Sequence, residues 1–159
     1  MTDTELVLRL ATATATGAVL GLNRKLRGKP AGLRTHALVS LGAALAVLTA
    51  DLVVGEGPGA DRGAVTRAIQ GIIAGVGFLG GGAILKSGAA DVVRGLTTAA
   101  SIWLSACVGV ACGAGYWLAA VVAVALALLV LVAGGPLEKI AGRLAGERPR
   151  DRRRQGDGR

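Results

Sequence analysis

Residues 95–137 read GLTTAASIWLSACVGVACGAGYWLAAVVAVALALLVLVAGGPL, and none of these 43 residues carries a charge. One membrane-spanning helix needs about 20 apolar residues, so this run is long enough for two. A soluble protein of 159 residues could not bury so long an uncharged run and would expose a large apolar surface to water. We therefore exclude a soluble enzyme, a disulfide-stapled secreted domain and a coiled coil, and predict a small integral membrane protein.

The composition of the whole chain agrees with this prediction. Hydrophobic residues make up 52% of the sequence, and charged residues make up 18%, against about a quarter in soluble domains. The net charge of +8 comes from clusters beside apolar segments, with five basic residues at positions 24–34 and eight at positions 139–159. Such clusters are typical of membrane topology, so we expect a lipid bilayer and no nucleic acid as the partner.

We predict an all-α polytopic membrane protein with five transmembrane helices. A glycine pair in residues 112–116 (CGAGY) is a turn signal and divides the long uncharged run into two spans. Residues 1–137 then form the membrane domain, and residues 138–159 form a basic, disordered tail. The predicted spans are residues 6–22, 33–54, 65–85, 95–111 and 117–132.

The loop charges predict the orientation of the helices. Basic residues are in excess in the loops after the first and third spans and in the tail, whereas the loop after the second span is balanced. Because cytoplasmic loops carry the excess of lysine and arginine, we expect the N-terminus outside and the C-terminus in the cytoplasm. Five spans satisfy this alternation, and four would not.

A shift of 63 residues aligns the first two spans with the third and fourth. Seven of the 17 positions 31–47 are identical to their counterparts, including Gly32 with Gly95 and Leu33 with Leu96. We predict a parallel repeat around an axis along the membrane normal, with the fifth helix added. Each half places polar residues at a cytoplasmic helix start, where free N–H groups and the positive end of the helix dipole lie. These candidate functional residues are Arg34, Thr35, His36, Arg94, Thr97 and Thr98.

Residues 71–82 (GIIAGVGFLGGG) form the densest glycine run. Small residues spaced by four let helix backbones approach closely in a membrane, so we interpret the run as a helix-packing surface. The alternative is a broken span whose free backbone groups line a polar site. We favour packing, because broken backbone inside a membrane must find partners and few polar side chains are nearby. The candidate packing residues are Gly71, Gly75, Gly77, Gly80, Gly81 and Gly82.

The sequence shows no arrangement of residues that indicates catalysis or metal binding. No nucleophile–base pair, phosphate-binding loop or pair of carboxylates is present, so we expect neither an enzyme nor a cofactor. No Cys, Asp or Glu cluster stands beside His36 to complete a metal site. A magnesium path would need several oxygen ligands near the membrane centre. The acidic residues nearest the spans lie instead at span ends or in loops, namely Asp51, Glu56, Asp61 and Asp91.

Three motifs resemble the signatures of MgtC/SapB-type membrane proteins. The first combines GLNR at residues 21–24 with GKPAGLRTHALVSLG at residues 28–42. The second is GVGFLGGGAIL at residues 75–85, and the third is RGLTTAASIW at residues 94–103. They occur in the family's order and cover about residues 17–115. The candidate residues that this motif adds in the predicted loop are Asn23, Arg24, Pro30 and Gly32.

The resemblance implies a bacterial inner-membrane protein of five helices that is associated with magnesium homeostasis and adaptation to low magnesium. It also implies a modulator of other membrane proteins, the F-type ATP synthase among them. Two interpretations stay open. In one, the protein is an accessory or regulatory module whose small-residue faces bind partner helices, with a homo-oligomer also open. In the other, it transports Mg²⁺ or another small solute through the repeat interface. The abundance of glycine and the lack of intramembrane carboxylates favour the first.

Overall fold

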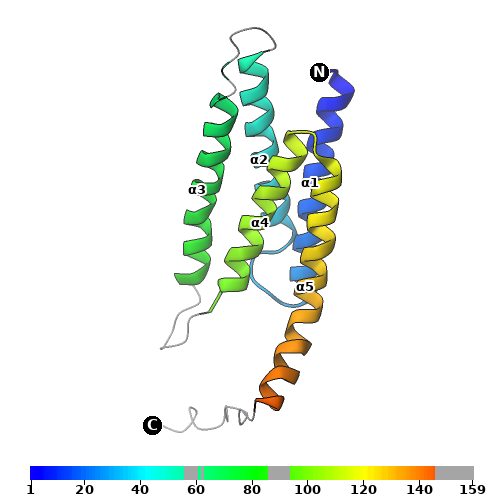
Figure 1. Ribbon diagram of the computed structural model, residues 1–159, viewed down its shortest axis with the longest axis vertical. Helices are drawn as coiled ribbons and strands as arrows, with labels where there is room; N and C mark the ends of the chain where they lie inside the picture. The colour runs from blue at the N-terminus through cyan, green and yellow to red at the C-terminus, as the bar shows by residue number, and fades with distance from the viewer. Residues whose placement is uncertain (56–60, 62, 86–93, 146–159) are drawn as a thin grey trace.

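The computed structural model describes residues 1–55, 61, 63–85 and 94–145, and these form a bundle of five helices (Figure 1). Each helix is long and apolar enough to cross a membrane. The described residues contain no strand. The prediction of an all-α protein with five transmembrane helices is therefore confirmed. The helices are α1 (Asp3–Leu26), α2 (Leu33–Val54), α3 (Gly63–Leu85), α4 (Leu96–Gly113) and α5 (Trp117–Leu144).

Helix α4 is the centre of the bundle. It packs against all four other helices, whereas α3 contacts only α2 and α4 among the described elements, and α5 contacts only α1 and α4. Half of the α4 span is buried, against 6% of the α3 span. The core lies where α1, α2, α4 and α5 meet, and it consists mainly of small aliphatic side chains. Its buried members are Ala13, Leu20, Ala44, Val108, Cys112, Ala120, Val124 and Ala127.

Equivalent residues of the predicted repeat occupy similar places. Helices α2 and α4 begin at Leu33 and Leu96, which are 63 residues apart, and each follows a glycine. A Cβ atom added to Gly17 of α1 would meet the backbone of residue 36, and one added to Gly80 of α3 would meet residue 99. Gly17 and Gly80 are 63 residues apart, and so are residues 36 and 99. These equivalences support the repeat, whose axis stays a prediction.

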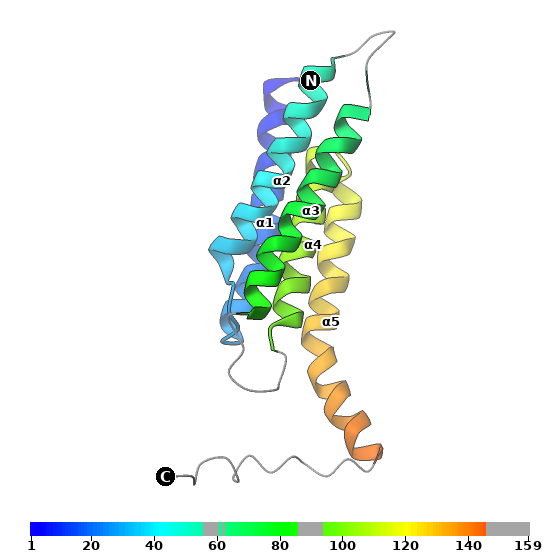
Figure 2. The ribbon, with the colours of Figure 1, turned by 90° about the vertical axis from the view of Figure 1, so that its left-hand side faces the viewer.

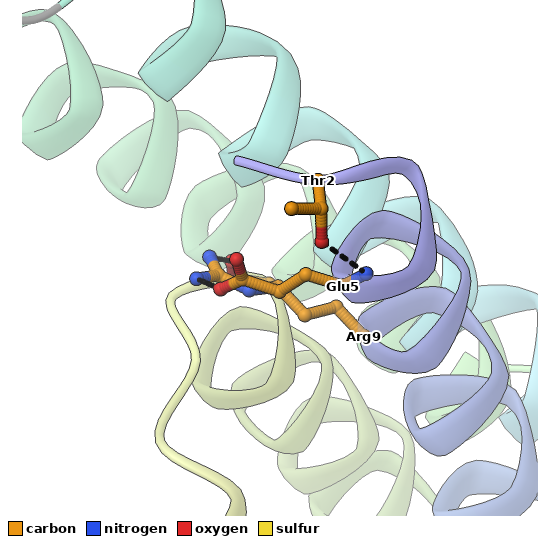
Figure 3. Close-up of polar contacts among 4 residues, drawn as sticks. Thr2, Glu5 and Arg9 are labelled. Atoms are coloured by element: carbon orange, nitrogen blue, oxygen red, sulfur yellow. Dashed lines mark hydrogen bonds and ion pairs between the residues drawn. The ribbon is translucent and has the colours of Figure 1, made fainter.

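Arg9 lies near the start of α1, inside the first predicted span, and it is held by contacts with two helices. Its guanidinium group donates from Nη1 to the carbonyl oxygen of Gly113 at 2.7 Å and pairs through Nη2 with the carboxylate of Glu5. Figure 3 shows Arg9 extending from α1 toward the end of α4, beside Glu5. The arginine thereby satisfies one of the carbonyl groups that the end of α4 leaves free. The side chain of Thr2 accepts a hydrogen bond from the backbone of Glu5 and caps the helix (Figure 3).

Helix α5 is longer than the predicted fifth span. It continues through Pro136 to Leu144, so residues 138–144 of the predicted tail are helical. Figure 2 shows these last turns reaching beyond the ends of the other helices. The remainder of the predicted tail, residues 146–159, lies outside the described residues. The helix thus continues past the predicted boundary at residue 137.

Candidate functional site

Two glycines let α1 approach α2 closely. A Cβ atom added to Gly17 would lie 2.5 Å from the carbonyl oxygen of His36, and one added to Gly21 would lie 2.6 Å from that of Gly32. Real Cβ atoms do not come so close to backbone, so both positions require glycine. Arg24 follows on the same face of α1, since residues at i, i+4 and i+7 of a helix share one face. The close contact therefore carries Arg24 into the helix interface.

Two more glycines, on α4, also approach α2 closely, and the contacts of both helices include Ser40. A Cβ atom on Gly113 would lie 2.6 Å from the carbonyl oxygen of Ala44, and one on Gly109 would collide with the backbone of Ser40. Helix α2 is thus contacted by two Gly-x-x-x-Gly pairs, one on α1 and one on α4. This spacing is the one that membrane helices use for close backbone contact.

A buried polar cluster joins α1, α2 and α4. Arg24, His36, Thr98 and Ser101 are each at most 5% exposed. The Nη2 atom of Arg24 donates to the hydroxyl of Thr98. The imidazole of His36 lies 3.0 Å through Nδ1 from the carbonyl oxygen of Gly32 and 3.1 Å through Nε2 from the hydroxyl of Ser101. Three helices are therefore tied together by side chains whose only alternative partners would be lipid or empty space.

The hydrogen-bonding atoms of this cluster fix the role of His36. A carbonyl oxygen only accepts, so Nδ1 donates to Gly32, and when the ring is neutral Nε2 then accepts from the Ser101 hydroxyl. The Ser101 hydroxyl has one proton and also lies 2.8 Å from the carbonyl oxygen of Thr98, so that proton is shared between two acceptors. One turn further along, Ser105 donates to the carbonyl oxygen of Ser101 at 3.1 Å. Thr98, Ser101 and Ser105 form a polar row along one face of α4.

Some polar atoms in and beside the cluster have no partner. Among the described residues, Nε of Arg24, Oδ1 of Asn23 and Oγ of Ser40 are buried without a hydrogen bond. The two ion pairs of the described part join Arg9 to Glu5 and Arg67 to Asp61. Arg24 therefore carries a buried positive charge that no described carboxylate balances. A buried charge without an ion-pair partner is costly, so an anion beside Arg24 would be stabilising.

A cavity of about 900 Å³ opens beside Arg24, and we name it the basic cavity. Its walls are the end of α1 with the loop that follows, the first turn of α4, and α5. Gly95 precedes α4 and provides no side-chain cap, so the free N–H groups of that helix start are directed to this end of the bundle. Four cationic residues and one acidic residue line the cavity, namely Arg24, Arg27, Lys29, Arg94 and Glu138.

The structure brings together only part of the predicted site. Arg34 and Thr35 are exposed on α2 and are not among the residues that line the basic cavity. The buried arginine that shares the cavity with Arg94 is Arg24, the arginine of the loop motif, and not Arg34. His36 lies in the buried cluster, and Gly32 lies against α1. The predicted residues that do line the cavity are Asn23, Arg24, Pro30, Arg94, Thr97 and Thr98.

Sequence reasoning missed the residues that bind the helices together. Ser101 and the glycine pairs of α1 and α4 were not among the candidate residues, nor were Arg27 and Lys29. A signal was present in the spacing of α1, where Ala13, Gly17, Leu20 and Arg24 recur at intervals of three and four. All four are buried. An arginine that continues a buried stripe indicates a functional or structural partner inside the protein.

The glycine run of α3 forms an unbroken helix, as the packing interpretation requires. Within the described chain, however, only Gly80 packs against another helix, with an added Cβ atom 3.4 Å from that of Ala99. A Cβ atom on any of the other five glycines would meet nothing within 4 Å. At 100° per residue, these five fall within an arc of about 160° that also contains Phe78, with Gly80 on the opposite side. Packing within the chain thus holds for Gly80 alone, because the arc faces away from α2 and α4. The five open glycines are Gly71, Gly75, Gly77, Gly81 and Gly82.

In the part of the chain that the structure describes, no three His, Cys, Asp or Glu side chains gather into a group that could hold a metal ion. The chemistry that the site offers is therefore that of guanidinium, ammonium and hydroxyl groups around a helix start. Such groups bind anions through charge-assisted hydrogen bonds.

Comparison with known proteins places the chain in a family. Residues 10–140 match the MgtC family. Protein SrpB of Synechococcus elongatus is 42% identical over 142 residues, which cover 86% of this chain and 78% of that protein. Protein MgtC of Brucella abortus is 43% identical over 131 residues, and protein MgtC of Salmonella typhimurium is 39% identical over 138 residues. These two matches cover 82% and 87% of this chain but only 52% and 54% of the relatives, so the chain spans about half their length.

No solved structure matches the chain significantly. The sequence matches, the three motifs and the five apolar helices agree with one another. The chain belongs to the MgtC family and is a multi-pass protein of the bacterial inner membrane.

Proposed function

We propose that the protein is an accessory or regulatory module of the inner membrane, linked to magnesium homeostasis, that acts by helix contacts with other membrane proteins. The observation that carries the proposal is the open glycine arc of α3. Helix glycine costs about 0.5–1 kcal/mol relative to alanine, and five glycines here have no contact with the described residues that requires them. A second helix that approaches closely would require them.

The surroundings of the arc support contact with a protein helix. Phe78 is 84% exposed and lies within the arc, so a large apolar side chain stands between small residues. A facing helix could pack its side chains against the glycine positions and around the phenylalanine ring by van der Waals contact. Helix α3 also has the least buried span of the five. The partner would be another membrane protein, with the F-type ATP synthase suggested by the family resemblance, or a second copy of the chain.

Growth in low magnesium tests this proposal. In a bacterium that depends on this protein, Gly75→Leu and Gly81→Leu should abolish growth in low magnesium while the protein accumulates normally. The matched control is Gly42→Leu on α2, an exposed helix glycine that also has nothing within 4 Å of an added Cβ atom. The control should grow normally. Normal growth of all three variants at equal protein level would refute a role for the arc.

Transport of Mg²⁺ or another small solute through the repeat interface is the alternative. Its route would follow the polar row of α4 inward from the basic cavity. Arg24 stands buried at the start of that row, and three further cationic residues line the cavity beside it. A positive entrance repels a divalent cation, so this route favours anions over Mg²⁺. Magnesium uptake by proteoliposomes that contain only this protein would support the alternative.

A further inference from the structure

We infer that the basic cavity is a binding site for a phosphate group. The inference does not depend on the helix contacts proposed above, because the cavity lies at the end of the bundle where α1 ends and α4 begins. It rests on a buried charge, on the positive end of a helix and on the composition of the cavity walls.

The buried charge comes first. Arg24 is 3% exposed and lines the cavity, and its Nε atom has no hydrogen-bond partner among the described residues. Its Nη2 atom is fixed by the hydroxyl of Thr98. The guanidinium is therefore held in one orientation with donor capacity unused. An anion in the cavity would supply the missing counter-charge and would accept from the guanidinium.

The start of α4 adds a second set of donors. The first turn of an α-helix leaves backbone N–H groups free, and Gly95 has no side chain to cap them. Thr97 and Thr98 place hydroxyl groups at the same turn, and both line the cavity. A phosphate group is the anion whose several oxygens can use N–H, hydroxyl and guanidinium donors together.

The equivalent start of α2 is covered by α1, so it offers no space for a ligand. The start of α4 therefore differs from an ordinary helix end. At the start of α2, Gly21 of α1 lies so close to Gly32 and Leu33 that even a Cβ atom has no room. Sixty-three residues after Gly21 the chain has Ile84, so α3 has no glycine with which to close over α4 in the same way. Of the two helix starts, only the one at α4 borders the cavity.

The size and charge of the cavity also fit such a ligand. A volume of about 900 Å³ lies in the range of small-molecule sites and exceeds what one inorganic phosphate needs. Arg27, Lys29 and Arg94 add charge around Arg24, against the single carboxylate of Glu138. The α5 wall is partly apolar, with Val130 and Leu131 in it. A phosphate group can come from the head group of an anionic lipid, whose chain would follow this wall, or from a free phosphate.

Two measurements on the full chain distinguish these sources. In the first, inorganic phosphate is titrated into detergent-purified protein, and the unfolding temperature is compared with that in chloride at equal ionic strength. In the second, the protein is placed in phosphatidylcholine nanodiscs with and without phosphatidylglycerol, and lipid retained by the protein is counted by native mass spectrometry. A shift with phosphate indicates free phosphate, and selective retention of phosphatidylglycerol indicates a head group. Either result supports the site.

Matched variants make the test specific. Arg94→Gln removes an exposed charge from the cavity, and Arg34→Gln removes an exposed charge from the start of α2, outside the cavity. Arg94→Gln should weaken binding about tenfold, which corresponds to the loss of one charge-assisted contact of about 1.4 kcal/mol. Arg34→Gln should change binding less than twofold. Arg24→Gln should abolish binding if this variant folds. If it does not fold, Lys29→Gln is measured in its place, because Lys29 lies in a loop.

Two outcomes would overturn the inference. One is that neither phosphate nor phosphatidylglycerol is bound in preference to its control. The other is that Arg34→Gln weakens binding as much as Arg94→Gln, because the attraction would then be that of a basic surface and not of the cavity.

Discussion

The chain uses glycine in two regions with opposite results. Around α2, four glycines on α1 and α4 touch backbone so closely that no side chain fits. On α3, six glycines within 12 residues produce a single close contact with the described part of the chain, at Gly80. Both regions contain pairs spaced by four residues. Glycine spacing therefore shows where two helices can pack closely. The burial of the neighbouring residues shows whether the second helix belongs to the same chain.

The largest effect is expected where the packed region is broken. Gly109→Leu should prevent folding, because even a Cβ atom there collides with the backbone of Ser40. Overpacking a core by single carbons costs about 1–3 kcal/mol, and here rigid backbone and three further carbons are involved. The yield of monodisperse protein after detergent extraction measures this. Gly42→Leu, the open glycine of α2, is the control and should extract like the wild type. Recovery of folded Gly109→Leu would contradict the close contact of α2 and α4.

The second effect tests the polar cluster that the packed glycines bring together. His36→Ala should lower the free energy of unfolding by about 3 kcal/mol, since it leaves a cavity and removes one hydrogen bond each from Ser101 and Gly32. Thr35→Ala, one residue earlier on the exposed side of α2, should change it by less than about 0.5 kcal/mol. Thermal unfolding in detergent measures both variants. Equal effects would mean that His36 has no special part in joining α2 to α4.

The sequence was enough to predict the spans, because hydrophobic length reports directly on a membrane, and the family, because three motifs occur in the family's order. Residues 33–54 were predicted as the second span, and α2 has those bounds. The functional end was predicted only in part. Positive charge at a helix start indicated Arg34 and Arg94 equally, yet Arg34 is exposed and outside the cavity.

The rest depends on which face of each helix turns inward. Arg24 stands at the end of a buried stripe of α1, and this stripe was visible in the sequence only as a spacing of small residues. Ser101 could not be recognised, because its importance comes from His36, which is 65 residues away. Glycine density was misleading for a physical reason: it records how closely a helix can be approached, and the approaching helix can belong to another molecule.

The third effect concerns leucine substitutions at the open glycines of α3, where the first concerned a packed glycine of α4. Gly77→Leu and Gly81→Leu should change the free energy of unfolding of the isolated protein by less than about 1 kcal/mol, because a Cβ atom at either position meets nothing within 4 Å. Gly80→Leu should destabilise it clearly, since Gly80 is the glycine that lies against α4. Unfolding temperatures in detergent compare the three variants. Destabilisation by Gly77→Leu as strong as that by Gly80→Leu would show that α3 packs in a different rotation.

The smallest effect concerns the start of α3, where an ion pair joins two residues that are close in the sequence. Arg67 pairs with Asp61 at 2.6 Å, and this pairing holds the pKa of the Asp61 carboxyl below its ordinary value. Because the folded-state pKa is the lower one, the pair stabilises the protein above the unfolded-state pKa of about 3.9 and loses this effect as pH falls through the folded-state value. Both side chains are 65% exposed, so solvent screens the pair.

Asp61→Asn should therefore lower the unfolding temperature only slightly at pH 7, and the difference from the wild type should shrink as the pH falls below about 3.9. Thermal unfolding of both proteins at pH 7 and at about pH 3 checks the sign. A difference that grows as the pH falls would mean that the carboxyl group is stabilised in its protonated form and would contradict the ion pair. An effect at pH 7 as large as that of His36→Ala would mean that the start of α3 contributes to the fold as much as the region packed around α2.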